Sequence, residues 1–196
     1  MKWIVLLAIF ALLLSACVPM ALMMEPELLS VGSFKHAVGM DLLVGFSETV
    51  VVPWTFQYLL RYGFTEWMEA SVRAAIPSIF ISAPSLTLEA GAKFGVPGLP
   101  NAALLVGGGA FFGNSPSGLN NGEGIFEPYL RVAPMAGFKV GGWNVIAKLQ
   151  LFIASDFGFI PGIAVTNGRF YLELDIPITG GTTVPDGGLL GIGYAF

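Results

Sequence analysis

The chain has 196 residues, a length that suits a single domain. It is 55% hydrophobic and only 11% charged, whereas a soluble globular domain carries about 25% charged residues. This composition argues against an ordinary water-facing surface, and the net charge of −4 gives no basic surface for nucleic acid.

Beyond its N-terminus, the sequence has no uninterrupted apolar run of about 20 residues, which a membrane-spanning helix needs. In lipid, every backbone polar group must find a partner within the protein, so only helices and closed barrels can span a bilayer. The composition therefore favours an all-β fold, a closed antiparallel barrel, over a bundle of helices.

The first residues have the pattern of an export signal. A Met-Lys start precedes an apolar run over residues 3–14, and small residues follow that run. A short positive start, an apolar core and small residues before the cleavage site are typical of a secretory signal. We expect residues 1–16 to form a helical signal peptide.

Cys17 is the only cysteine of the chain, so an intramolecular disulfide is excluded. The run Leu14-Ser15-Ala16-Cys17 resembles the lipobox of bacterial lipoproteins, which implies cleavage before Cys17 and attachment of lipid to its thiol. The alternative is an ordinary signal cut a few residues later, which would remove Cys17. Residues 17–36 have little periodicity, and we expect them to form a periplasmic tether.

From residue 37 onward, polar and apolar residues alternate in one segment after another, which is typical of strands with two unlike faces. In chain order, these segments are 40–47, 54–61, 68–74, 85–96, 126–132, 143–153, 169–178 and 189–196. Residues 102–112 and 158–166 are apolar on both faces, so alternation does not identify them as strands. We nevertheless count them and expect about ten strands, with eight as the alternative if these two segments are not strands.

The connections between these segments differ in length on the two sides. Gly141-Gly142 and Asn167-Gly168 suit tight hairpin turns with positive φ, whereas the connection over 113–124 is long. Short turns on one side and longer loops on the other are typical of transmembrane barrels. We expect residues 37–196 to form an up-and-down barrel with both chain ends on the short-turn side.

The last strand carries alternate apolar residues up to a terminal aromatic ring: Leu190, Ile192, Tyr194 and Phe196. This pattern resembles the C-terminal signal that the barrel-assembly machinery reads. Together with the alternation over residues 37–196, it resembles the bacterial outer-membrane β-barrel class. The resemblance implies an outer-membrane location with both termini in the periplasm, contact with outer-membrane lipid, and insertion by that machinery. Some poorly characterised barrels of this class are transport-related, which implies a porin-like role.

The charged residues of the alternating segments share one face, which we expect to line the lumen. They are Asp41, Arg61, Glu69, Arg73, Glu89, Lys93, Glu127, Arg131, Lys148, Arg169, Glu173 and Asp175. Side chains fill the interior of a small barrel, so these balanced charges favour a structural network of ion pairs. The alternative is a narrow polar pathway for a small solute. A selective ion pore needs one sign to dominate a constriction, and here neither sign dominates.

Catalytic and metal-binding motifs are lacking in the sequence. His36 is the only histidine and falls in the expected tether. Glu173 and Asp175 share a face and form a candidate acid–base pair, but Arg169 on that face favours a salt-bridge ladder. No cluster of His and Cys residues indicates a metal site. We therefore expect neither an enzyme nor a cofactor.

Two other functions remain open at this stage. Alternation does not say which face lies inside, so a lipocalin-like periplasmic carrier would place the apolar face inward around a hydrophobic ligand. The low total charge argues against this, because the outside of such a carrier would be sparsely charged. A lipid-modifying outer-membrane enzyme is the weaker alternative.

Overall fold

The computed structural model describes residues 21–45, 51–77, 86–114, 124–154, 157–179 and 187–196. Strands make up most of these residues. They are β1 (Phe34–Gly45), β2 (Val51–Thr65), β3 (Met68–Pro77), β4 (Leu86–Val96), β5 (Leu99–Asn114), β6 (Gly124–Val140), β7 (Trp143–Ile153), β8 (Phe157–Thr166), β9 (Phe170–Asp175), β10 (Ile178–Thr179) and β11 (Gly187–Ala195).

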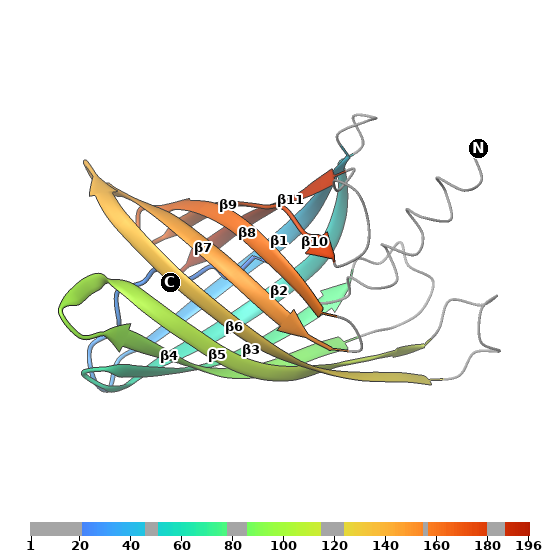
Figure 1. Ribbon diagram of the computed structural model, residues 1–196, viewed down its shortest axis with the longest axis horizontal. Helices are drawn as coiled ribbons and strands as arrows, with labels where there is room; N and C mark the ends of the chain where they lie inside the picture. The colour runs from blue at the N-terminus through green and yellow to red at the C-terminus, as the bar shows by residue number, and fades with distance from the viewer. Residues whose placement is uncertain (1–20, 46–50, 78–85, 115–123, 155–156, 180–186) are drawn as a thin grey trace.

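The strands form one closed antiparallel barrel (Figure 1). Strands β1 to β8 pair in chain order, β8 pairs with β9, β9 with β11, and β11 with β1. Strands β9 and β10 both pair with β8 and are separated only by Ile176 and Pro177. Because proline has no backbone N–H to donate to a ladder, we treat β9 and β10 as one interrupted strand.

The barrel therefore has ten strands, which confirms the all-β, closed, up-and-down architecture. The two segments that were apolar on both faces are strands as well. Residues 102–112 lie in β5 and residues 158–166 make up most of β8. The expected count of ten strands is confirmed, and the alternative of eight is not.

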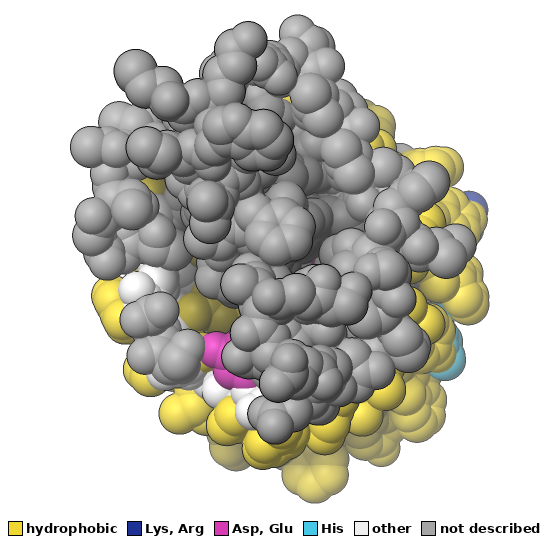
Figure 2. Space-filling model, turned by 90° about the vertical axis from the view of Figure 1, so that its right-hand side faces the viewer, with side chains coloured by type: hydrophobic (Ala, Val, Ile, Leu, Met, Phe, Trp, Pro, Cys, Tyr) yellow, Lys and Arg dark blue, Asp and Glu magenta, His cyan; other side chains and the backbone are white. Residues whose placement is uncertain are grey.

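The two faces of the sheet differ sharply in charge. Side chains alternate across a strand, and no outward-facing position of the described strands carries a charged residue. Large apolar side chains are exposed there instead, among them Phe126, Leu130 and Ile163. Viewed from the end of the barrel on the right of Figure 1, hydrophobic side chains follow the outer edge and acidic ones lie within the ring (Figure 2).

Tight turns join β2 to β3, β4 to β5, β6 to β7 and β8 to β9 at one end of the barrel, which we call the turn end. Gly98, Gly141 and Gly168 have φ values of 78°, 60° and 85° there, a region that glycine adopts without steric cost. The expected tight turns at Gly141 and Gly168 are thus confirmed. At Gly168, the side-chain oxygen of Asn167 also accepts hydrogen bonds from the amides of Arg169 (3.0 Å) and Phe170 (2.8 Å).

The start of the barrel differs from the expectation. Strand β1 begins at Phe34 rather than at residue 37, and residues 21–29 lie within the ring of strands instead of forming a tether outside it (Figure 1). We call residues 21–29 the luminal segment. The expected signal peptide and Cys17 lie outside the described residues.

Candidate functional site: the lumen of the barrel

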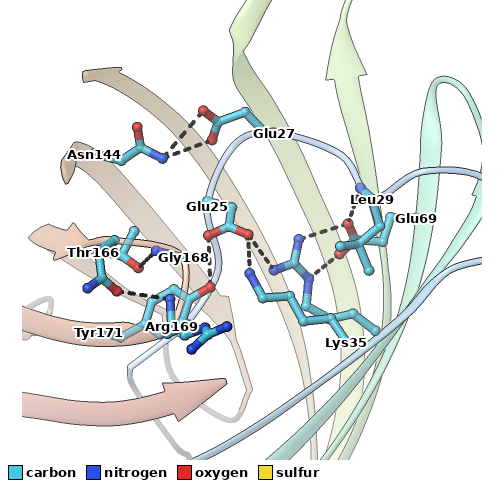
Figure 3. Close-up of polar contacts among 12 residues, drawn as sticks. Glu25, Glu27, Leu29, Lys35, Glu69, Asn144, Thr166, Gly168, Arg169 and Tyr171 are labelled. Carbon is cyan, nitrogen blue, oxygen red and sulfur yellow. Dashed lines mark hydrogen bonds and ion pairs between the residues drawn. The ribbon is translucent and has the colours of Figure 1, made fainter. Parts of the chain in front are cut away.

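A cluster of acids and cations holds the luminal segment near the turn end (Figure 3). The Glu25 carboxylate accepts hydrogen bonds from Lys35 Nζ (2.5 Å) and Tyr171 Oη (2.8 Å). Arg61 Nη1 lies 3.5 Å from the same carboxylate. Arg61 also donates two hydrogen bonds to Glu69, at 2.5 and 2.8 Å. One guanidinium from β2 therefore links an acid of the luminal segment to an acid of β3.

The electrostatic balance around Glu25 favours its charged form. Burial raises the pKa of this carboxyl group, but the charges of Arg61 and Lys35 and its hydrogen bonds lower the pKa by more. The net pKa lies below the ordinary value for glutamate. Glu25 is thus an anion held between cations, at the only place where the luminal segment presents a buried charge.

A second acid of the luminal segment lies closer to solvent. Glu27 is 3.4 Å from Lys139 Nζ and accepts a weak hydrogen bond from Asn144 Nδ2 (3.4 Å). Lys139 and Asn144 come from the β6–β7 hairpin and, with Glu25 and Glu27, line a shallow hollow at the turn end. The two acids, separated by Pro26, therefore contact different sides of the barrel wall.

Four wall side chains bind the main chain of the luminal segment rather than its side chains. Two cations donate to carbonyl oxygens, and two carboxylates accept from amides. Arg73 donates to the carbonyl oxygens of Ala21 (3.0 Å) and Leu22 (2.8 Å), and Lys93 donates to those of Glu25 (2.9 Å) and Glu27 (2.8 Å). Glu173 accepts from the amides of Leu22 (2.5 Å) and Met23 (3.3 Å). Glu69 accepts from the amide of Leu29 (3.2 Å).

Six of the inward-facing glycines make room for this segment. A Cβ atom at any of these six would meet an atom of residues 21–30. The positions are Gly39 and Gly193 against Met23, Gly191 against Ala21, Gly137 against Pro26, Gly95 against Leu28, and Gly63 against Leu29 and Ser30. The wall is thus shaped for a peptide chain in this place, and we call these six residues the glycine track.

Deeper in the lumen, wall side chains bind one another. Glu89 lies 3.0 Å from Arg131 Nη2 and accepts a hydrogen bond from Tyr129 Oη at 2.8 Å. Asp41 accepts hydrogen bonds of 2.9 Å from both Thr55 and Gln57 on the neighbouring strand. These groups are buried, and polar groups in a low-dielectric interior need such partners.

Lys148 of β7 links two acids of β9. Its ammonium group lies 3.0 Å from each carboxylate oxygen of Asp175 and also forms an ion pair with Glu173. Glu173 in turn binds the amides of the luminal segment. The expected interpretation of Glu173 and Asp175 as members of a charge ladder therefore fits their surroundings, although the cation between them is Lys148 rather than Arg169.

Ten of the twelve residues expected in the lumen are buried there. They are Asp41, Arg61, Glu69, Arg73, Glu89, Lys93, Arg131, Lys148, Glu173 and Asp175. Glu127 also faces inward on β6 but is half-buried. Arg169 departs from the expectation: it is exposed in the β8–β9 turn, where the strand alternation does not extend.

The only histidine lies on a strand, not in a tether. His36 faces outward on β1, where its ring stacks on Phe196 with centroids 5.7 Å apart. Its Nδ1 atom lies 2.5 Å from Tyr58 Oη. Phe196 and Tyr194 also face outward, with Ile192 and Leu190 in line behind them. The recognition of these four residues by an assembly machinery stays a prediction.

Sequence reasoning missed the residues of the luminal segment and their partner Lys35. Residues 21–33 lack the two-residue period that identified the strands, and most of their hydrogen bonds involve main-chain atoms, which leave no trace in side-chain type. Two signals were present nonetheless. Glycines recur at many inward-facing positions, and the Glu25-Pro26-Glu27 sequence carries two acids in a chain whose expected lumen holds several cations.

Comparisons with known proteins add no family to this description. No protein-family model matches the chain, and a search of curated proteins finds no match. Among the described residues, no helix is long and apolar enough to cross a membrane. The same part of the chain has no group of three or more His, Cys, Asp or Glu residues placed to hold a metal ion.

Proposed function

We propose that this chain is an integral β-barrel lipoprotein of the bacterial outer membrane. The observation that carries the proposal is the segregation of charge. Every outward-facing position of the described strands is uncharged, while Arg61, Glu69, Lys93 and other ionised groups are enclosed. Hydrocarbon is the environment that favours this arrangement, because a charged side chain on the lipid face of a barrel costs about 2–4 kcal/mol near the midplane.

In this proposal, the turn end faces the periplasm and lipid is attached to Cys17. Short turns lie on the periplasmic side of transmembrane barrels, and β1 begins and β11 ends at the turn end. Outer-membrane lipid and the barrel-assembly machinery are then the partners of the chain.

We further propose that the barrel is closed at rest. The luminal segment, its ion pairs and the deeper wall network occupy the interior, which supports a structural role. A porin-like role for a narrow, small solute would require the luminal segment to move first.

The carrier and enzyme alternatives receive less support. A carrier of a hydrophobic ligand needs an apolar interior and a polar exterior, which is the opposite of the arrangement here. His36 lies on the outer face against Phe196, and Glu173 and Asp175 both form ion pairs with Lys148. We propose no catalytic role for these three residues.

Extraction from membranes tests the location. A Cys17→Ser variant, exported with an ordinary signal peptide, lacks any lipid anchor, so only the barrel itself can hold it. We expect this variant to stay in the membrane fraction after washing with alkaline carbonate and with urea. Its release by carbonate would overturn the proposal and favour a soluble carrier.

Conductance in planar bilayers tests the closed state: we expect no steady unit current from the unmodified chain.

A further inference from the structure

The contacts of the luminal segment resemble those of a bound peptide more than those of a folded core. All seven hydrogen bonds from Arg73, Lys93, Glu173 and Glu69 to the segment involve main-chain atoms. Main-chain hydrogen bonds supply affinity for an extended peptide without regard to its sequence. The wall therefore offers a general grip on a polypeptide chain, contributed by strands β3, β4 and β9.

Sequence preference enters at two carboxylates. Glu25 fits among Lys35, Arg61 and Tyr171, and Glu27 reaches Lys139 and Asn144. Hydrogen bonds between ionised partners are about twice as strong as those between neutral groups. A peptide with acids two positions apart would satisfy both places, as the Glu-Pro-Glu sequence does here.

The shape of the wall points to the same ligand. A side chain on any residue of the glycine track would occupy space that the segment now fills. At Gly63 the colliding atoms are main-chain atoms of Leu29 and Ser30, and none of the three nearest belongs to the barrel wall. The wall thus leaves room at these six positions for one peptide chain.

An empty lumen would leave wall charges poorly satisfied. Arg73 is fully enclosed and donates to two carbonyl oxygens of the segment. Lys93 donates to two more and keeps an ion pair with Glu69 at 3.1 Å. Loss of the partners of a buried charge is strongly destabilising. Departure of the segment therefore favours its replacement by a ligand that offers the same carbonyl oxygens.

We infer that the lumen is a binding site for an acidic peptide, which residues 21–29 occupy in cis and which a second peptide of the same kind can occupy in trans. The ligand class is a polypeptide with carboxylates at positions i and i+2 that adopts the bent path of the segment, in which Met23 has a φ of 50°. This inference does not depend on the membrane location of the barrel, because it rests only on luminal contacts.

The test uses the full chain, folded before it is cut. A protease site is inserted between Val31 and Gly32, which are both exposed, in the Cys17→Ser variant that has no lipid anchor. Cleavage then leaves the segment attached only by its contacts. A fluorescent peptide with the sequence of residues 21–31 is added. Fluorescence anisotropy measures its binding, and mass spectrometry of the washed barrel measures loss of the original segment. Heat-modifiable migration on a gel confirms that each preparation remains folded.

We expect saturable binding of the peptide, with exchange of the original segment. A peptide with Gln in place of both acids should compete at least about tenfold less well, which corresponds to about 1.4 kcal/mol. A scrambled peptide that keeps one residue between its two acids should lose less affinity than the Gln peptide. These peptide variants leave the barrel unchanged, so a folding defect cannot explain their behaviour. An Arg73→Met barrel, if it folds, should bind the peptide more weakly.

Three results would overturn the inference. The cut segment could leave on dilution while no added peptide binds. It could stay and never exchange, which would make it a permanent part of the fold. The Gln peptide could compete as well as the acidic one, which would remove the carboxylate recognition. Each result leaves the membrane extraction test unaffected, so failure here is distinguishable from failure of the proposed function.

Discussion

At the scale of single residues, an ion cluster lies near the turn end of the barrel, and Glu25, Arg61 and Glu69 each have more than one charged partner there. Arg61 is fully enclosed and is bound to Glu69 while it also lies near Glu25. Removing one member of such a cluster leaves the others buried with fewer partners, which costs much more than the pair contributes in net stability. Exposed pairs behave differently, because water screens them and their loss is nearly neutral.

Substitution of Arg61 tests this difference. We expect Arg61→Met to lower the free energy of unfolding by about 3–5 kcal/mol, because Glu25 and Glu69 would lose their shared cation. The control is Lys139→Met, which removes a cation whose side chain is 67% exposed and should change stability by at most about 1 kcal/mol. Urea unfolding of the refolded protein in micelles measures both. Equal effects of the two substitutions would contradict the assignment of Arg61 as the centre of the cluster.

Acid should loosen the luminal segment through Glu25. Arg61 and Lys35 hold the pKa of this carboxyl below its ordinary value despite its burial. Its stabilising contribution is therefore complete above the ordinary pKa and is lost as the pH falls through the lower pKa of the folded state. We expect hydrogen exchange of residues 22–29, corrected for intrinsic rates, to accelerate in that acidic range. In Glu25→Gln, the segment should already exchange faster at neutral pH and respond less to acid.

At the scale of elements, the closing strand β11 has two neighbours of different length. It pairs with β1 from Gly45↔Gly187 to Ala37↔Ala195, whereas its described pairing with β9 ends at Leu189↔Asp175. Beyond Ala195, Phe196 extends the β1 ladder by exchanging two hydrogen bonds with His36, at 3.1 and 2.9 Å. The terminal residue thus belongs to the ladder that closes the barrel and to the outward aromatic group.

The terminal aromatic ring should matter for assembly in cells more than for stability. We expect Phe196→Ala to lower the amount of folded barrel in membranes several-fold, while refolding of the purified chain in detergent stays nearly unchanged. Phe170→Ala is the matched control, because Phe170 is similarly exposed (55% against 65%) and also packs on Tyr194. A similar loss in both variants would indicate a general packing effect instead of a read signal.

At the scale of the whole molecule, the structure combines an apolar outside with a filled inside. The alternation of residue types predicted eight of the ten strands and placed their charges on one face, because lipid and lumen impose opposite demands on successive residues. The low total charge, not the alternation, favoured the lumen as the place of the charged face. The alternation did not predict residues 21–29, whose partners contact main-chain atoms. It also failed at Arg169, because the alternation of polar and apolar residues in β9 was extended into the β8–β9 turn. It failed at β1 as well, because this strand begins with Phe34 and Lys35, before the residues that alternation identified.

Opening of the lumen should follow from a single added methyl group. We expect Gly63→Ala to displace the C-terminal end of the luminal segment from the wall, because the new Cβ would collide with main-chain atoms of Leu29 and Ser30. Steady currents should then appear in planar bilayers. The control Gly107→Ala also adds an inward methyl, but its nearest neighbours are wall atoms at 3.2 Å and beyond, so it should stay silent. Silence of both variants would mean that the deeper wall network closes the barrel by itself.

The glycine track also connects the two ends of the barrel sequence. Gly191 and Gly193 of the last strand contact Ala21 and Met23, which the ribosome makes some 170 residues earlier. Residues 21–23 can therefore reach their final surroundings only when β11 arrives. Closure of the barrel wall and binding of the luminal segment therefore occur together, late in biogenesis. A chain that lacks β11 would leave its apolar residues 21–23 accessible to periplasmic chaperones.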